Sequence, residues 1–253
     1  MPFVTAGDPS AQTTAAVLKG LRDADVDLIE LGFPYSDPIA DGPVIQASYT
    51  RALDNGVTVQ SIFDTMAGLR DEGLPPVLAM VSYAIVFRSG TDAFAAKAAA
   101  VGFSGLIIPD LPADEAGEMS ATATTHGLDL VQLIAPTTTP DRTQQILDAS
   151  SGFVYCVSVA GTTGVRKELP AALIEQLMQL RLMTDLPLAV GFGISGPDQV
   201  ASLEGVADGV IVGSAIVRLA AEASSAEAAA DAVRAFSSEM RAAVNGVRPS
   251  RKK

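Results

Sequence analysis

Three carboxylates stand within one short stretch of the chain, residues 28–43. Glu30 lies inside an apolar run, residues 28–32, while Asp37 and Asp41 follow in a segment stiffened by prolines. Alternate residues of an extended strand face opposite ways, so both faces of this run are apolar apart from Glu30, as in a strand covered on both sides. Burial there would raise the pKa of Glu30 and suit it to proton transfer. The alternative is a glutamate at the strand edge that reaches solvent.

Asp41 and Tyr155 complete the candidate acid–base set. Tyr155 is in phase with Phe153 and Val157 in a later apolar run, so its phenol can point to the inside of the fold with their side chains. Two alternatives stay open. Asp41 precedes a Gly-Pro pair, and an aspartate in such a turn can simply accept hydrogen bonds from its own backbone. Tyr155 can equally be a core aromatic whose hydroxyl is hydrogen-bonded.

The residue types that are scarce in this chain exclude several kinds of chemistry. The chain has one histidine, His126, and one cysteine, Cys156, so a zinc site built from these ligands is implausible. A Ser-His-Asp triad would need His126, which stands beside Gly127 at an expected helix end. No lysine lies in an expected strand, which disfavours a Schiff base. Cleavage of a carbon–carbon bond would therefore need a substrate that carries its own electron sink.

Glycine-rich segments follow two of the expected strands near the end of the chain, at residues 189–195 and 209–217. Glycine lets backbone N–H groups approach an anion closely, and a helix that begins near Ser214 would add its dipole. The loops after strands seven and eight of a barrel often bind phosphate. Gly161 and Gly164, after the sixth expected strand, could supply a third side. Either of the two glycine-rich segments alone could simply contain glycines required by turns. Together they indicate a substrate with one phosphate.

Short apolar runs alternate with amphipathic helical stretches along the whole chain. Strands are expected at residues 2–6, 27–33, 77–82, 105–109, 128–135, 152–159, 187–191 and 209–213. Helices are expected at residues 12–23, 59–70, 113–125, 141–149, 170–183 and 225–245, with starts at Asp8-Pro9-Ser10 and Thr58. These units predict a single (β/α)8 TIM barrel over residues 1–253, with its active site at the carboxyl ends of the strands. An open doubly wound sheet is the alternative, but its usual nucleotide turn is missing.

Composition narrows the partners and the compartment. A net charge of −12 opposes binding to nucleic acid or anionic membranes, and the basic tail, residues 248–253, is expected to be disordered. No apolar run is long enough to cross a bilayer, and no leader pattern precedes the first strand. A single cysteine cannot form an internal disulfide, which fits a reducing, cytoplasmic location.

Several blocks of this sequence resemble the tryptophan synthase alpha chain family. The most specific is Glu30-Leu-Gly-Phe-Pro-Tyr-Ser-Asp-Pro-Ile-Ala-Asp-Gly-Pro-Val-Ile-Gln46. Further blocks are Pro2-Phe-Val-Thr-Ala-Gly-Asp-Pro9, Ser158-Val-Ala-Gly-Thr-Thr-Gly-Val-Arg166, Gly191-Phe-Gly-Ile-Ser195 and Gly213-Ser-Ala-Ile-Val217. The blocks occur in order over nearly the whole chain. The resemblance implies cleavage of indole-3-glycerol phosphate to indole and glyceraldehyde 3-phosphate, in which the protonated indole ring is the electron sink.

The resemblance also implies a role for each site residue. Glu30 would move the protons, Asp41 would accept a hydrogen bond from the indole N–H, and Tyr155 would orient the glycerol hydroxyl or Glu30. Phe3 and Phe192 match the apolar positions on either side of the ring. The phosphate binders match Gly164, Gly193, Gly213 and Ser214, and Thr163 matches a lid residue that meets Asp41. No metal or cofactor is expected in this chain.

A beta chain that carries pyridoxal phosphate is the implied partner, in a heterotetramer of two alpha and two beta chains, with Pro34 and Asp37 at the contact. The sequence departs from the family in three places. The usual helix before the first strand is not seen, the segment Ser82-Tyr83-Ala84 replaces a more aromatic strand end, and Thr162 stands where valine is common. Two rival interpretations are a sugar-phosphate isomerase on the same fold and a non-catalytic subunit that only activates a partner.

Overall fold

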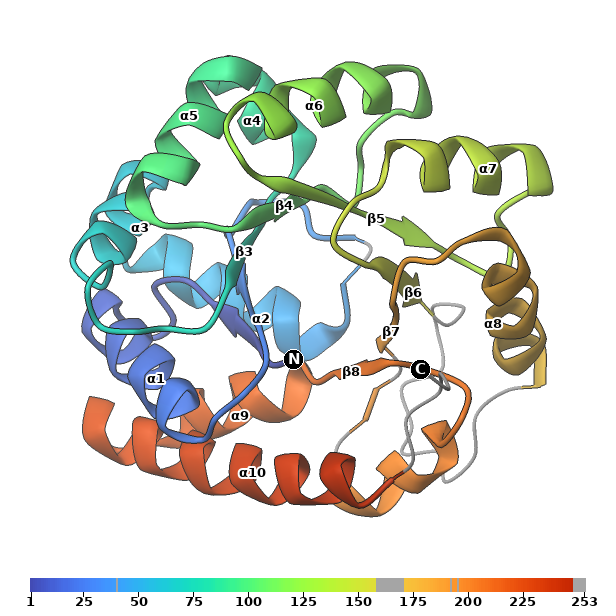
Figure 1. The fold of residues 1–253 in the computed structure, drawn as a ribbon. Helices are drawn as coiled ribbons and strands as arrows, with labels where there is room; N and C mark the ends of the chain where they lie inside the picture. The colour runs from blue at the N-terminus through green and yellow to red at the C-terminus, as the bar shows by residue number, and fades with distance from the viewer. Residues whose placement is uncertain (40, 158–170, 192, 195, 248–253) are drawn as a thin grey trace.

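Eight parallel strands form the centre of the computed structural model, and helices surround them (Figure 1). The structure describes residues 1–39, 41–157, 171–191, 193–194 and 196–247. The strands are β1 (Phe3–Thr5), β2 (Ile29–Gly32), β3 (Val77–Met80), β4 (Gly105–Ile107), β5 (Asp129–Ile134), β6 (Val154–Val157), β7 (Leu188–Gly191) and β8 (Gly209–Ile211). Each strand pairs with the next, and a bridge between Pro2 and Val212 joins the last to the first. The predicted (β/α)8 barrel is confirmed.

Helices alternate with the strands around this barrel. They are α1 (Ala11–Asp23), α2 (Pro43–Asp54), α3 (Val59–Ala67), α4 (Tyr83–Ser89), α5 (Thr91–Val101), α6 (Ala113–Thr125), α7 (Pro140–Ala149), α8 (Ala171–Met183), α9 (Ser214–Glu222), α10 (Ala226–Gly246) and a 3-10 helix, η1 (Pro197–Leu203). Ser10 caps α1 by accepting from the Thr13 N–H at 3.0 Å, and Thr58 forms a capping box with Ser61 at the start of α3. Both starts agree with the sequence. None of these helices has the length and apolar character needed to span a bilayer.

The two faces of the sheet pack into separate apolar layers. Outward side chains such as Leu31 and Leu106 fill the layer between strands and helices. Inward side chains fill the barrel: Leu78, Ile107, Val131, Phe153, Tyr155, Ala189 and Ile211. The register of β1 and β3 places Glu30 level with Phe3 and Leu78. Because side chains alternate along each strand, Glu30 shares the inner face of the barrel with these apolar residues.

Four phenylalanines hold the carboxyl end of β2 against the outer helices. Phe33 directly follows this strand, and its ring lies 5.7–5.9 Å from those of Phe63, Phe94 and Phe103. Tilted and edge-on contacts at these separations are favourable for aromatic pairs. The loop that follows β2 therefore begins from a well-packed point.

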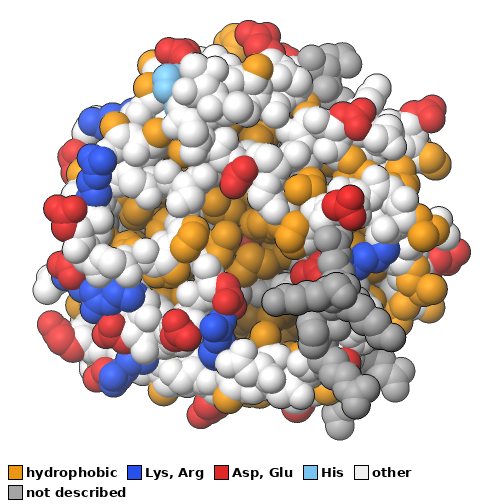
Figure 2. All heavy atoms as spheres, viewed as in Figure 1, with side chains coloured by type: hydrophobic (Ala, Val, Ile, Leu, Met, Phe, Trp, Pro, Cys, Tyr) orange, Lys and Arg blue, Asp and Glu red, His pale blue; other side chains and the backbone are white. Residues whose placement is uncertain are grey.

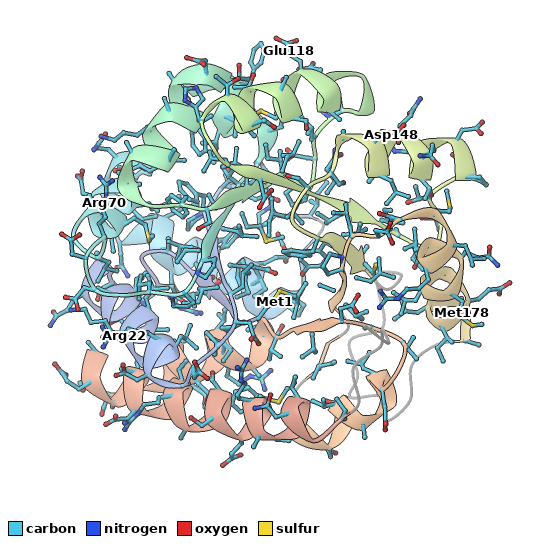
Figure 3. The ribbon with its side chains drawn as sticks, in the orientation of Figure 1. Met1, Arg22, Arg70, Glu118, Asp148 and Met178 are labelled. Atoms are coloured by element: carbon cyan, nitrogen blue, oxygen red, sulfur yellow. The ribbon has the colours of Figure 1, made fainter. Side chains whose placement is uncertain are left out.

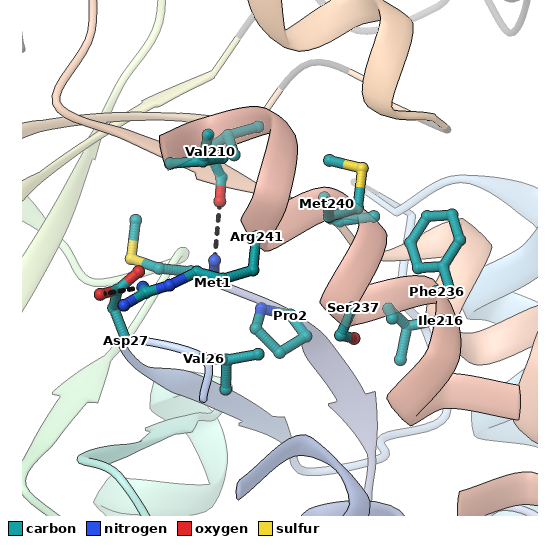
Figure 4. Close-up of a pocket in the computed structure, with 12 residues that line it drawn as sticks. Met1, Pro2, Val26, Asp27, Val210, Ile216, Phe236, Ser237, Met240 and Arg241 are labelled. Carbon is teal, nitrogen blue, oxygen red and sulfur yellow. Dashed lines mark hydrogen bonds and ion pairs between the residues drawn. The ribbon is translucent and has the colours of Figure 1, made fainter. Parts of the chain in front are cut away.

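A cavity of about 40 Å³ lies between α10, β8 and the amino ends of β1 and β2 (Figure 4). Apolar side chains such as Val26, Ile216 and Met240 line most of it. Met1 lies near the middle of the view in Figure 3, and Figure 2 shows apolar side chains gathered there with charged ones around them. The cavity is far smaller than the roughly 300–1,000 Å³ of typical ligand sites. It is also at the wrong end of the strands for barrel chemistry.

Candidate active site

Glu30 is completely buried at the centre of the barrel, on β2. Neither of its carboxylate oxygens has a hydrogen-bond partner among the described residues. Burial raises its pKa to about 8, because an ionised carboxylate is poorly stabilised away from water. The alternative of a strand-edge glutamate that reaches solvent is therefore wrong. At neutral pH this side chain holds a proton, and no described residue offers it a hydrogen-bond partner.

Tyr155 points into the same space from β6, as its alternation with Phe153 predicts. Its ring lies across Gly191 of β7, where a β-carbon would come within 2.8 Å of the Tyr155 hydroxyl oxygen. Glycine at position 191 is what leaves room for the phenol. Burial raises the pKa of Tyr155 well above its usual value, and the nearby Glu30 and Asp41 raise it further. The hydroxyl therefore keeps its proton and can donate a hydrogen bond.

Asp41 lies on the loop between β2 and α2 and is only partly buried. Burial raises the pKa of its carboxyl, whereas a hydrogen bond from the Tyr35 hydroxyl lowers it. The Asp41 N–H donates to the Pro38 carbonyl at 3.1 Å, which closes a turn. The Asp41 carboxyl is near enough to Tyr49 and Tyr155 to raise the pKa of both phenols.

Three neighbours of Asp41 were not predicted from the sequence. Tyr49, on α2, is buried, and its ring lies 5.6 Å from that of Tyr35. Gln46, one turn earlier on α2, donates from its amide to the Asp41 carbonyl at 2.8 Å. A helix start at Pro43 was the available signal, since proline is common at the first helical position. It would have placed Gln46 and Tyr49 on successive turns facing the barrel.

Phe3 supplies an apolar wall on β1 beside these groups. Its ring occupies the space over Gly32, where a β-carbon would lie 2.4 Å from the ring and 3.0 Å from the Tyr49 hydroxyl. Phe3 also belongs to the cluster that contains Ile45, Tyr49 and Val217. Phe192, the residue expected on the other side of the ring, lies outside the described residues.

The expected phosphate end lies at the carboxyl ends of β7 and β8. Gly193 has a φ of +54°, a conformation that favours glycine. Gly213 precedes α9, whose first residue, Ser214, is exposed. The space beside Gly213 borders Phe3 and Ile45, so this helix start adjoins the aromatic wall. Thr163 and Gly164 lie outside the described residues.

The rim around these groups carries the remaining predicted positions. Pro34 is buried, whereas Asp37 is exposed and Ile39 is 92% exposed. At the end of β3, the Ser82 hydroxyl and the Tyr83 N–H both donate to Asp110, each at 2.7 Å. Tyr83 also donates to Glu115. The unusual segment Ser82-Tyr83-Ala84 is thus fixed by carboxylates from the β4–α6 region.

Comparison with known proteins decides the family. The family model described as tryptophan synthase alpha chain matches residues 1–245. The chain belongs to the tryptophan synthase alpha chain family. A tryptophan synthase alpha chain from Rhodopirellula baltica is 50% identical, over 88% of this chain and 81% of the relative. Another, from a Picosynechococcus species, is 47% identical over 96% and 92% of the two chains.

Solved structures of tryptophan synthase agree with the family at the level of the fold. A chain from the a2b2 complex of Pyrococcus furiosus is 39% identical and has a TM-score of 0.88, over 95% of this chain and 96% of the other. A chain of tryptophan synthase from M. tuberculosis gives 35% identity and a TM-score of 0.85, over 96% and 91%. As a tryptophan synthase alpha chain, this protein is a lyase subunit of tryptophan biosynthesis. The alternative of a sugar-phosphate isomerase is wrong.

Proposed function

We propose that Glu30 is the proton shuttle with which this alpha chain cleaves indole-3-glycerol phosphate. The observation that carries the proposal is a fully buried carboxyl group without a partner, whose pKa is about 8. A group of this kind holds a proton near neutral pH and can still exchange it. It gives a proton to C3 of the indole ring, which makes the ring an electron acceptor. It then takes a proton from the glycerol hydroxyl.

The bond changes balance without a redox partner. As the hydroxyl loses its proton, a carbonyl forms and the bond between C3 and the glycerol carbon breaks. The bonding electrons return to the indole ring, which regains aromaticity as indole leaves. The other product is glyceraldehyde 3-phosphate, and Glu30 is again protonated. No cofactor is needed in this chain, because the protonated ring accepts the electrons.

Asp41 and Tyr155 assist the same cleavage, Asp41 at the indole ring and Tyr155 at the glycerol hydroxyl or Glu30. Asp41 accepts a hydrogen bond from the indole N–H and stabilises the positive charge that develops when C3 is protonated. Tyr155 keeps its proton and orients the glycerol hydroxyl or Glu30. Phe3 forms one wall of the ring site, and its position over Gly32 supports this role. Phe192 is proposed for the opposite wall on the resemblance alone.

The phosphate is bound at the start of α9. Backbone N–H groups near Gly213 and Ser214 point out of a helix N-terminus, which favours an anion. Gly193 contributes from the neighbouring strand end. Gly164 is proposed as a further phosphate binder, and Thr163 as the lid residue that meets Asp41, on the resemblance alone.

The partner is a beta chain that carries pyridoxal phosphate, in a heterotetramer of two alpha and two beta chains in the cytoplasm. The structures of such complexes from a relative support this assembly. Asp37 is exposed on the loop after β2, where a partner can touch it directly. Pro34 is buried and would act by shaping that loop.

Release of indole from indole-3-glycerol phosphate tests the proposal. Wild-type protein and Glu30→Gln are assayed with and without a beta chain. We expect the variant to lose roughly 10²–10⁴-fold in kcat, as loss of an acid–base group does. Unchanged indole release by folded Glu30→Gln would show that another group moves the protons. Absence of release by the wild type, even with a beta chain, would favour a non-catalytic subunit.

A further inference from the structure

The loop that carries Asp41 is held by a side chain from the helix that follows it. The Gln46 amide nitrogen donates to two loop carbonyls, that of Pro38 at 3.1 Å and that of Asp41 at 2.8 Å. Both hydrogens of the amide are therefore used. The N-cap of α2 is Gly42, which has no side chain with which to cap the helix. Gln46 thus makes the polar connection between α2 and this loop.

Tyr35 approaches Asp41 from the other end of the same loop. Its hydroxyl lies close enough to the Asp41 carboxylate to lower the pKa of that carboxyl. Its ring packs on Tyr49 at a centroid distance of 5.6 Å and an interplanar angle of 60°. Tyr49 is 3% exposed and lies against Phe3 and Gly32 of the barrel. Tyr35 is therefore supported by the barrel itself.

The far end of α2 is also fixed. Arg51 donates from two nitrogens to the Asp8 carboxylate at 2.8 and 2.7 Å, and the Asp8 side chain is 2% exposed. Two parallel hydrogen bonds of this kind add geometric definition as well as energy. The helix is thus tied to the loop after β1 at one end and to the Asp41 loop at the other. It can hold Asp41 in a constant position.

We propose that Gln46 and Tyr35 are positioning residues for Asp41, with Gln46 fixing its backbone and Tyr35 its carboxylate. The inference rests on the proposed contact between Asp41 and the indole N–H. Reacting groups must be held within small tolerances, since a misplacement of about 1 Å can reduce a rate on the order of 10²-fold. Asp41 lies on a loop rather than on a strand or helix, so neighbouring residues such as Gln46 and Tyr35 have to fix its position.

The first experiment is a double-mutant cycle on kcat/KM for indole release. Gln46→Met keeps the length of the side chain and removes both donors. It is made in the wild type and in Asp41→Ala. We expect about a tenfold loss in the wild type and less than about a twofold change in Asp41→Ala, because the effect of Gln46 passes through Asp41. Gln179→Met, on an exposed part of α8, is the matched control and should leave kcat/KM unchanged.

The second experiment follows kcat/KM against pH in Tyr35→Phe. Without the phenol hydrogen bond the pKa of Asp41 rises, so activity is lost at a higher pH on the acid side. Tyr83→Phe is the matched control, because its hydroxyl binds Glu115 instead. A change in packing alone would lower activity without moving the acid limb.

The outcomes separate this inference from the proposed function. If Asp41→Ala alone leaves kcat/KM unchanged, the proposed role of Asp41 fails. If Asp41→Ala is costly but Gln46→Met has the same effect in both backgrounds, the positioning role of Gln46 fails. An acid limb that stays in place in Tyr35→Phe overturns the role of Tyr35. Circular dichroism confirms that each variant is folded before it is assayed.

Discussion

The two ends of this barrel treat buried polar groups in opposite ways. In the active site, inside the barrel, Glu30 is wholly buried and both of its oxygens are unpartnered among the described residues. At the amino ends, Arg241 forms an ion pair with Asp27 (Figure 4) and a second one with Asp25, at 3.4 Å. The unpartnered atoms described there are the neutral Ser237 hydroxyl and one nitrogen of that paired guanidinium. Burial also lowers the pKa of the Met1 amino group at the amino end, but that group donates a hydrogen bond to the Val210 carbonyl at 2.9 Å, whereas no described residue bonds to the Glu30 carboxyl.

This difference separates chemistry from architecture. An isolated buried carboxyl group destabilises a fold when it ionises, and a pKa shift of one unit corresponds to about 1.4 kcal/mol. Such an arrangement persists where a proton has to be exchanged. The ion pairs at the amino end impose no comparable electrostatic cost, and they stabilise the contact between α10 and the start of β2. Predictions that perturb one end and then the other should therefore separate activity from stability.

The largest effect is expected in the pH dependence of stability at Glu30. Below about pH 4.5 the carboxyl is protonated in both folded and unfolded chains. Between that pH and about 8 only the folded chain keeps the proton, so the free energy of unfolding falls relative to Glu30→Gln. The relative loss is about 1.4 kcal/mol for each pH unit, and it stops above the folded pKa. Urea unfolding of both proteins from pH 5 to 9 measures it, and parallel curves would contradict a raised pKa.

A smaller effect is expected at the phosphate end. Ser214→Asp places a negative charge at the start of α9, where the proposed phosphate binds. Repulsion should raise KM about tenfold or more with a smaller change in kcat. Ser214→Ala keeps the backbone N–H and should change KM little. Ser225→Asp adds the same charge at the N-cap of α10, a position where aspartate is a good cap, and serves as the control. An unchanged KM in Ser214→Asp would place the phosphate elsewhere.

Much of this comparison could be predicted from the sequence because it depends on strand periodicity. The alternation around Glu30 predicted a covered strand, and the phase of Tyr155 with Phe153 predicted its inward direction. Parallel strands that end at one edge then bring Glu30, Tyr155 and the glycine segments to the same end. The strands are shorter than expected, since β4 ends at Ile107 rather than at residue 109. Hydrophobicity continues past the last ladder hydrogen bond, so it overestimates strand length.

The support of Asp41 could not be predicted in the same way. Its partners Tyr35 and Gln46 belong to a loop and to the first turns of a helix that was not expected, α2. The aspartate, proline and glycine residues of the loop between β2 and α2 indicate turns, but they do not define where that loop lies over the barrel. The helices α4 and α5 were missed for a related reason, because Gly90 separates them into short segments with little periodicity. Tertiary packing, rather than local pattern, determines these positions.

The smallest effect is expected at the amino end of the barrel. Arg241→Met removes the pairs with Asp25 and Asp27 but keeps an apolar stem beside the cavity. Both aspartates are mostly exposed, so water replaces much of the lost interaction. The free energy of unfolding should fall by no more than about 1 kcal/mol, and the difference should shrink with added salt. The rate of indole release should not change, because this end has no part in the reaction. A loss of activity without a loss of stability would show that the two ends are coupled, and the separation of chemistry from architecture would then be incorrect.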